Sequence, residues 1–281
     1  QWRVFLHSVQ LRMAMRVCYT DMAGEAQKIA EKAVASGVIE KNEDNALLHV
    51  LENRSALCFN DWSDYRAGAD LICYMNGYKD PRRAKYFTTV KLLEKDVYVG
   101  MRIGINYTGS DDNLIKGHSN RLITATDPYV WLTASEVSFL RAEGALRKWN
   151  MGGDAQNFYE TGVRLSFEEN GVKGVDEYLK SLSLPESYQA LVAGSPANSP
   201  SNITVKWNES GESAFEENLE RIITQKWIAI YPNGIEAWSE HRRTHYPKLF
   251  PVEVNKGKNV STEAGMRRLM YPAEEYTQNA T

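Results

Sequence analysis

Apolar residues recur at helical spacing in three separate blocks of the chain. The first block, residues 2–36, carries two apolar stripes, of which the clearer is Leu6, Val9, Met13 and Val17. Residues spaced three and four positions apart share one face of a helix. This block therefore predicts a pair of amphipathic helices.

The second block, residues 133–170, predicts another helix pair. Gly152 and Gly153 break its apolar pattern, and Asp154 follows them as a candidate N-cap. The first helix of this pair can begin at Thr133 or Ser135, which are also cap-forming residue types.

The third block, residues 213–244, predicts two further helices. Ser213 and Glu216 have the S-x-x-E spacing of a capping box, in which each side chain accepts a hydrogen bond from the other residue's free backbone N–H. Helix pairs of this size resemble tetratricopeptide hairpins, although the period is too irregular for repeats to be counted. The predicted fold is mostly α, with tetratricopeptide-like helix pairs forming a scaffold.

Long irregular segments separate these blocks. Residues 38–130 are rich in Asn, Asp, Gly and Tyr, residues 182–210 are rich in Ser, Pro and Asn, and residues 245–281 show no helical period. We expect these segments to form loops and short strands on the scaffold, where binding residues usually lie. The whole chain, residues 1–281, is expected to be a single domain.

Charge and hydropathy exclude some classes of partner. The 33 Lys and Arg residues are balanced by 36 Asp and Glu residues, for a net charge of −3. A nucleic-acid-binding protein usually presents a concentrated basic surface, so we expect no nucleic-acid partner. No apolar run approaches the roughly 20 residues that a membrane-spanning helix needs.

The candidates for catalysis and metal binding are weak. His241 and His245 have the i, i+4 spacing of a zinc clamp, but Arg242 follows the first histidine where the catalytic motif needs Glu. Glu136 and Glu143 would lie roughly 10 Å apart on one helix face, which is too far for a glycosidase pair. No phosphate-binding or dinucleotide-binding motif is present, so we expect no enzyme, no metal and no cofactor.

An aromatic and polar set in the first insertion is the best binding candidate. Aromatic faces pack against the C–H surface of sugar rings, while neighbouring polar groups bond to hydroxyls; the same residue types also suit peptides. Two interpretations stay open, because these rings could instead pack the insertion onto the scaffold. The predicted ligand-binding residues are Trp62, Tyr65, Arg66, Tyr74 and Tyr78.

Five stretches in order along the chain resemble the SusD/RagB family of outer-membrane nutrient-binding lipoproteins from Bacteroidetes. They are Trp2 with Leu11–Arg16; Trp62 with Tyr78–Arg82 and Tyr98–Arg102; Glu136–Glu143 with Trp149–Gly153; Gln225–Trp227 with Glu236–Trp238 and Arg242–Pro247; and Arg267–Asn279. Each stretch is short, but together they cover nearly the whole chain.

The resemblance implies a surface-exposed, lipid-anchored protein of the outer membrane that is not catalytic. Such proteins lie over a SusC-like TonB-dependent β-barrel and capture oligosaccharides for import. It further implies that the lipid anchor, the first helix pairs and a short C-terminal tail lie outside this sequence. Two alternatives remain: a peptide-binding protein of the RagB type, and a scaffold that binds only a protein partner. The resemblance also implies that Gln225, Trp227, Glu236, Trp238, Arg242 and Arg243 form one buried cluster.

Overall fold

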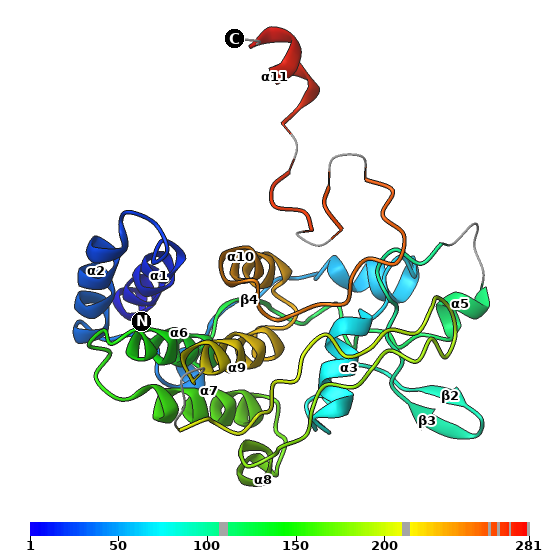
Figure 1. Cartoon of the computed structure of the whole chain (residues 1–281), viewed down its shortest axis with the longest axis horizontal. Coiled ribbons are helices and arrows are strands. Elements are labelled where there is room, and N and C mark those ends of the chain that lie inside the picture. Colours follow the sequence, from blue (N-terminus) through cyan, green and yellow to red (C-terminus); the bar gives the residue numbers. More distant parts are fainter. Residues whose placement is uncertain (107–111, 210–213, 258–259, 263–264, 270, 280–281) are drawn as a thin grey trace.

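The computed structural model describes residues 1–106, 112–209, 214–257, 260–262, 265–269 and 271–279. Within these residues the chain is mostly helical with a few short strands, which confirms the predicted fold class (Figure 1). The scaffold contains α1 (Trp2–Arg16), α2 (Ala23–Ala35), α6 (Ala134–Leu146), α7 (Ala155–Glu169), α9 (Ala214–Ala229) and α10 (Gly234–Thr244).

Side-chain caps begin the helices that position the core. Thr133 Oγ1 accepts a hydrogen bond from the Glu136 N–H at 3.1 Å, so Thr133 rather than Ser135 is the N-cap of α6. Asp154 caps α7 as predicted, accepting from the Asn157 N–H at 2.9 Å. These caps satisfy backbone donors that the first turn leaves free. Ser213, predicted to cap α9, lies outside the described residues.

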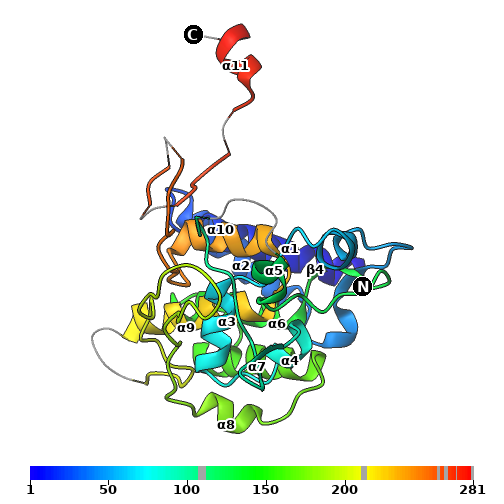
Figure 2. The ribbon, with the colours of Figure 1, turned by 90° about the vertical axis from the view of Figure 1, so that its right-hand side faces the viewer.

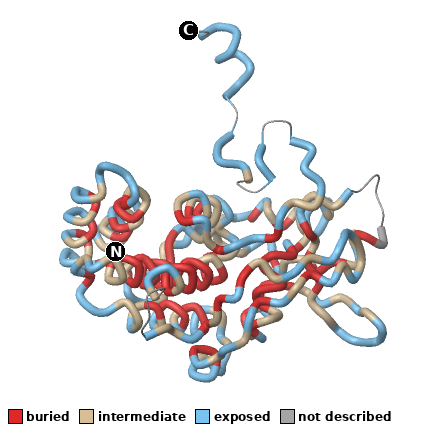
Figure 3. Tube along the Cα trace, in the orientation of Figure 1, coloured by how far each residue is buried: buried red, intermediate tan, exposed pale blue. Residues whose placement is uncertain are grey.

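Helix α6 is the most enclosed helix of the scaffold. It packs against α7, α9 and α1, and Figure 3 shows it as an almost continuous buried stretch at the centre of the molecule. A Cβ on Gly162 of α7 would lie 2.9 Å from the Phe139 ring of α6. The absence of a side chain at Gly162 therefore lets Phe139 fill the contact between the two helices.

The first insertion holds more regular structure than its sequence pattern indicates. Helix α3 (Ala69–Gly77) is buried over most of its surface, so it lacks the polar face that reveals a helix in a sequence. Helix α8 (Val175–Leu179), which lies outside this insertion, was also not predicted. The other short elements are η1 (Asn42–Asp44), η2 (Leu57–Asp61), α4 (Arg83–Tyr86), α5 (Asp112–Lys116), β1 (Ala46–Leu48), β2 (Val90–Leu92), β3 (Lys95–Val97) and β4 (Tyr129–Leu132).

The strands form two small antiparallel sheets. β1 pairs with β4, so the two ends of the first insertion lie side by side, with Leu48 opposite Tyr129. β2 pairs with β3 as a hairpin that projects from the body in Figure 1. The final helix, α11 (Ala273–Gln278), lies beyond α10 and away from the core, and none of its residues is buried (Figure 2).

A buried ion cluster joins α1, α6, α9 and α10. Lys226 on α9 is 1% exposed, and its Nζ lies 3.0 Å from Glu236, 3.5 Å from Glu136 and 3.5 Å from Glu240. Two arginines of α1 complete this end of the cluster: Arg12 pairs with Glu136 and Arg16 with Glu236, each at 2.7 Å.

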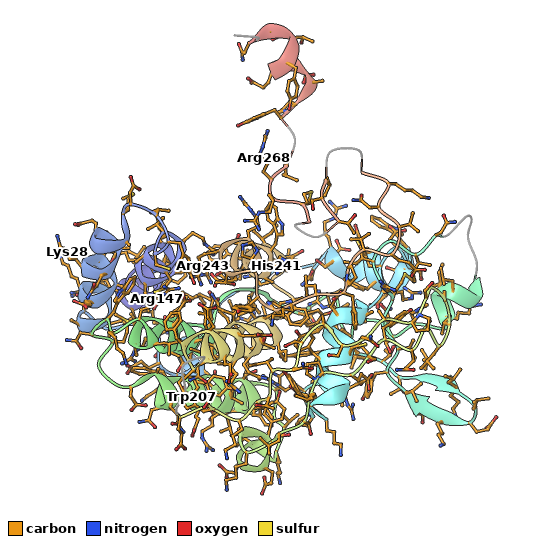
Figure 4. The ribbon with its side chains drawn as sticks, in the orientation of Figure 1. Lys28, Arg147, Trp207, His241, Arg243 and Arg268 are labelled. Carbon is orange, nitrogen blue, oxygen red and sulfur yellow. The ribbon has the colours of Figure 1, made fainter. Side chains whose placement is uncertain are left out.

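Arg243 on α10 extends the ion cluster toward Glu143 on α6. Its Nη1 lies 2.6 Å from Glu143, and it also contacts Glu240. Arg147 reaches the same Glu143 from the next turn of α6, and Figure 4 shows Arg147 and Arg243 close to this junction. Burial is tolerated because each charge has an opposite partner within hydrogen-bonding reach.

The cluster expected from the resemblance is divided among separate places. Glu236 and Arg243 belong to the ion cluster, whereas Gln225 bonds to Arg82 and Tyr178, and Trp227 packs on Tyr74 elsewhere in the core. Arg242 is exposed and stacks on the Trp238 ring, with its guanidinium carbon 4.7 Å from the ring centroid. The prediction of one buried set was therefore wrong, because the residues come from two helices, α9 and α10, and α10 directs its own side chains to different sides.

Arg82 anchors the first insertion to the scaffold. It is fully buried against Asp80, and its guanidinium donates to Ser166 Oγ at 2.9 Å on α7 and to Gln225 Oε1 at 3.0 Å on α9. The Tyr178 hydroxyl of α8 bonds to Asp80 at 2.8 Å. The Asp80–Arg82 pair thus fixes the position of the insertion relative to the scaffold helices α7 and α9 and to α8.

We predict that Lys226→Ala lowers the free energy of unfolding by about 3–5 kcal/mol, because it leaves buried carboxylates without their shared cation. Denaturant unfolding followed by circular dichroism measures this change. Lys28→Ala is the matched control, since Lys28 is exposed on α2 and pairs only with the exposed Glu25 (Figure 4). Equal stability of the two variants would show that the cluster adds little.

We also predict a loss of stability in acid that depends on Glu240. Burial raises the pKa of Glu240, but the charges of Lys226 and Arg243 outweigh burial and lower this pKa to about 2. The group is therefore more acidic in the folded state, and its contribution is complete above the unfolded pKa of 4.5 and lost as the pH falls toward 2.

Urea unfolding between pH 2 and pH 6 tests this effect. The stability difference between wild type and Glu240→Gln should be largest at pH 6 and shrink toward pH 2. Glu25→Gln, on the exposed surface of α2, serves as the control. A difference that stays constant over the whole range would contradict the assignment.

Candidate ligand-binding surface

Trp62 and Tyr65 follow a π-helical turn that brings both rings to the surface. In η2 the Trp62 N–H donates to the Leu57 carbonyl at 2.8 Å, and the Asp64 N–H then bonds to Cys58 at 3.0 Å. Ser63 between them has a φ of 57°, which turns the chain sharply. As a result Trp62 is 60% exposed and Tyr65 is 56% exposed.

The neighbouring loop holds this turn in place. The Asn60 amide donates to the Ile123 carbonyl at 3.0 Å, and the Asn120 amide donates to the Phe59 carbonyl at 2.8 Å. The Tyr65 ring packs on the Phe59 ring with 5.7 Å between centroids. Side-chain hydrogen bonds given in both directions, from the turn to the loop and from the loop to the turn, therefore hold the backbone that carries the two exposed rings.

Two exposed carboxylates belong to the same turn as the exposed rings. Asp61 precedes Trp62 directly, and Asp64 follows it by two residues. The turn thus combines apolar ring surface with carboxylate acceptors, residue types that suit a ligand with both C–H surfaces and hydroxyl donors.

Arg66 has a positioning role in this structure. Its Nε donates to the Ile115 carbonyl at 2.8 Å, and its Nη1 donates to the Tyr65 carbonyl at 2.6 Å. Partial burial lowers the pKa of Arg66. These bonds to the backbone link the residues after Trp62 to the end of α5.

Tyr74 and Tyr78 correct the sequence prediction, because both belong to the core. They are 0% and 3% exposed, and their hydroxyls donate to the Lys248 carbonyl at 2.8 Å and the Ile203 carbonyl at 2.9 Å. Their rings meet edge to face, with centroids 5.9 Å apart. A surface ligand cannot reach these rings, so the packing interpretation holds for this pair.

The structure therefore divides the predicted set. Trp62 and Tyr65 are exposed together on the turn after η2, with Arg66 behind them, whereas α3 places Tyr74 and Tyr78 in the interior. The spacing of four residues between the two tyrosines is that of one buried helix face, and it was the available signal for this outcome.

A second aromatic surface was missed by the sequence analysis. Trp2 and Trp131 are exposed, and both rings approach Phe5, at 6.0 Å and 6.4 Å between centroids. They line a pocket of about 240 Å³ together with Asn45. No local sequence signal could bring Trp2 and Trp131 together, because this surface forms where α1 packs against β4.

A larger pocket lies between α10 and the segment that follows it. It has a volume of about 720 Å³ and mainly apolar walls, including Trp238, Phe250 and Met266. His241 at its edge donates from Nδ1 to the Pro247 carbonyl at 3.1 Å, and burial lowers the pKa of this imidazole. His245 instead lies 3.3 Å from Arg267, so the two histidines of the sequence motif face different partners.

Among the described residues, no group of three or more His, Cys, Asp or Glu side chains is arranged to hold a metal ion. In the same part of the chain, no helix combines the length and the apolar character needed to cross a membrane.

The fold is a helix-pair scaffold that carries exposed aromatic rings on a long insertion. The family of SusD and RagB outer membrane lipoproteins matches residues 1–281, and the chain belongs to this SusD-like family. The resemblance noted in the sequence is thus confirmed.

Solved structures support the same assignment. A SusD homolog from Bacteroides thetaiotaomicron is 74% identical with a TM-score of 0.96, and the match covers 99% of this chain and 59% of that one. A SusD homolog from Bacteroides ovatus is 44% identical, with a TM-score of 0.91 over 99% of this chain and 59% of that one. A chitin-binding SusD homolog from Flavobacterium johnsoniae is 38% identical, with a TM-score of 0.90 and coverage of 99% and 58%.

The chain thus spans about three-fifths of the length of these structures. None of the curated proteins that were compared matches it.

Unfolding measurements test whether Tyr74 packs in the core while Trp62 lies in solvent. We predict that Tyr74→Ala lowers the free energy of unfolding by about 3–5 kcal/mol, because it leaves a cavity in the core. Trp62→Ala should change it by less than about 0.5 kcal/mol, because the ring is mostly in solvent. Thermal and urea unfolding of both variants measures the difference. Similar losses would mean that Trp62 also packs into the body.

Proposed function

We propose that this protein is a non-enzymatic nutrient-binding protein of the cell surface that captures oligosaccharides. The observation that carries the proposal is the exposure of Trp62 and Tyr65 on one fixed turn. A ligand that covers these two rings would remove apolar surface from water, which is favourable. Membership of the SusD-like family and the chitin-binding relative support this ligand class.

The chemistry of the turn favours a sugar over an apolar ligand. A ring face can stack on the C–H side of a sugar, while the Asp61 and Asp64 carboxylates accept hydrogen bonds from hydroxyls. The apolar pocket beside Trp238 presents few such acceptors and suits a hydroxylated ligand less well. Arg66 contributes by fixing the backbone of Tyr65.

The protein would deliver its ligand to a SusC-like TonB-dependent β-barrel of the outer membrane. Membership of a family of outer membrane lipoproteins supports this partnership. A lipid anchor would hold the protein at the membrane. In such an arrangement the protein needs affinity and release, and no catalytic group.

Affinity electrophoresis of the full-length protein through gels that each contain one polysaccharide tests the proposal. We expect one glycan to retard the wild type and Trp62→Ala to weaken retardation by a factor of about ten or more. A tenfold change corresponds to about 1.4 kcal/mol of binding energy, a modest value for the loss of one stacked ring.

Trp131→Ala is the matched control, because it removes another exposed tryptophan from the second aromatic surface. Retardation lost only in Trp131→Ala would move the site to that surface. Retardation lost in neither variant would keep the function and reject both sites. If no glycan retards the wild type, binding of peptides in the same assay format would favour the RagB-type alternative.

A further inference from the structure

A polar pocket lies between α9, near the centre of the molecule in Figure 1, and the loop of residues 199–203. Its volume is about 330 Å³, a size that suits a small molecule. Of the described residues that line it, Pro200 and Ile203 are apolar, and the rest are polar or charged: Ser199, Ser201, Asn202, Glu217, Glu220, Arg221 and Lys248. The pocket shares no residue with the turn that carries Trp62.

Two tyrosines of the core hold the backbone on two sides of this pocket. The Tyr78 hydroxyl donates to the Ile203 carbonyl at 2.9 Å, and the Tyr74 hydroxyl donates to the Lys248 carbonyl at 2.8 Å. Within the loop, the Ile203 N–H donates to the Ser201 hydroxyl at 3.0 Å. These bonds belong to the fold itself, so the pocket is formed before any ligand binds.

Two charged residues of α9 are buried at the wall of the pocket. Glu220 is 5% exposed and Arg221 is 7% exposed. Glu220 accepts a hydrogen bond from the Ser201 hydroxyl, and it also pairs with the Nζ of Lys248 at 3.2 Å. The Lys248 side chain is half exposed, so its ammonium is open to a ligand as well as to Glu220.

Arg221 keeps a hydrogen-bond donor that the fold does not use. Its Nη2 donates to the Thr204 hydroxyl at 3.2 Å, and its Nη1 donates to the Asn218 side chain at 3.1 Å. Among the described residues, none accepts from the buried Nε of Arg221. A buried donor without an acceptor is unfavourable, and an oxygen brought to this guanidinium by a ligand would reduce that cost.

The paired charges favour hydroxyl groups over a charged ligand. Besides the pair of Lys248 with Glu220, Arg221 lies 3.4 Å from Glu217. The charges that line the pocket therefore sum to zero, and the carboxylates would repel an anion. A zwitterionic amino acid would compete with both ion pairs. A hydroxyl group both donates and accepts, so it can bond to a carboxylate and a cation without separating them.

A sugar ring offers several hydroxyl groups on one compact frame. The groups that could meet them come from α9, from Lys248 and from the Ser199 and Asn202 side chains of the loop. None of the described residues that line the pocket is aromatic, so recognition would rest on hydrogen bonds and not on stacking. Hydrogen bonds to charged groups are stronger than those between neutral groups, and they select the positions of hydroxyls on the ring.

We propose that this pocket is a second binding site, which holds one neutral sugar unit through hydrogen bonds from its hydroxyl groups to Glu220, Arg221 and Lys248. The site goes beyond the proposed function, because it lies apart from the exposed rings and recognises its ligand by different chemistry. The turn with Trp62 presents apolar ring surface, whereas this pocket presents matched donors and acceptors.

Saturation-transfer NMR of the full-length protein with glucose, galactose, mannose, xylose and N-acetylglucosamine tests the proposal. The starting form is Trp62→Ala, so that the aromatic turn does not contribute. We expect at least one sugar to receive saturation from Trp62→Ala. The signal should fall at least fivefold when Lys248→Met or Glu220→Gln is added, because each removes one charge of the pocket at nearly constant shape. Lys206→Met is the matched control, since Lys206 is exposed near the pocket but does not line it.

Two results would overturn the proposal: no signal from any of the five sugars with Trp62→Ala, or a signal that neither pocket substitution reduces. Glycine serves as the zwitterionic probe, and a glycine signal that Lys248→Met removes, with no sugar signal, would assign the pocket to amino acids instead. Retardation of wild type by polysaccharide gels tests the aromatic turn separately. A sugar signal present in wild type and absent from Trp62→Ala would reject the pocket and leave the proposed function in place.

Discussion

The buried ammonium of Lys226 is the constraint on which the helical scaffold depends. Three carboxylates converge on it from α6 and α10, and the arginines of α1 close the outer side of the same cluster. Burial alone would lower the pKa of Lys226, but Glu240, Glu236 and Glu136 together raise it, so the group stays charged. Because a buried charge without its partner is strongly unfavourable, these four helices fit together in one arrangement, in which every partner is present.

A second buried cation, Arg82, joins the scaffold to the insertion that displays the exposed aromatic rings. Arg82 bonds to α7 and α9 through Ser166 and Gln225, and it belongs to the insertion that also contains η2. Tyr74 and Tyr78 add hydroxyl bonds from α3 to the segments around Lys248 and Ile203. These bonds hold α3 and Arg82 to the scaffold, and the same insertion displays Trp62 and Tyr65 at its surface. Rigid support reduces the entropy that a binding surface loses when a ligand docks.

The sequence predicted the parts of this structure that depend on local pattern. Helical spacing located α1, α2, α6 and α7, and the cap at Asp154 was identified because capping is a short-range interaction. Helix α3 was missed because it is buried on nearly all sides and shows no amphipathic period. The same burial explains the failure at Tyr74 and Tyr78, whose aromatic and polar neighbours look alike in a core and on a surface. Trp2 and Trp131 reach the same pocket because α1 packs against β4, although the two residues lie 129 positions apart in the sequence, and no local pattern encodes this approach.

The two kinds of aromatic residue in the first insertion differ in what happens to their polar atoms. Each core tyrosine directs its hydroxyl to one backbone carbonyl, so both its ring and its polar atom are already satisfied. On the exposed turn the bonds that fix the structure come from Asn60, Asn120 and Arg66, and each ends on a backbone carbonyl. Those three side chains support the turn while the rings and carboxylates next to them stay in contact with solvent. Aromatic surface left in water, on a backbone held by hydrogen bonds, is open to contact with a ligand; in this insertion the turn after η2 presents such surface, whereas α3 does not.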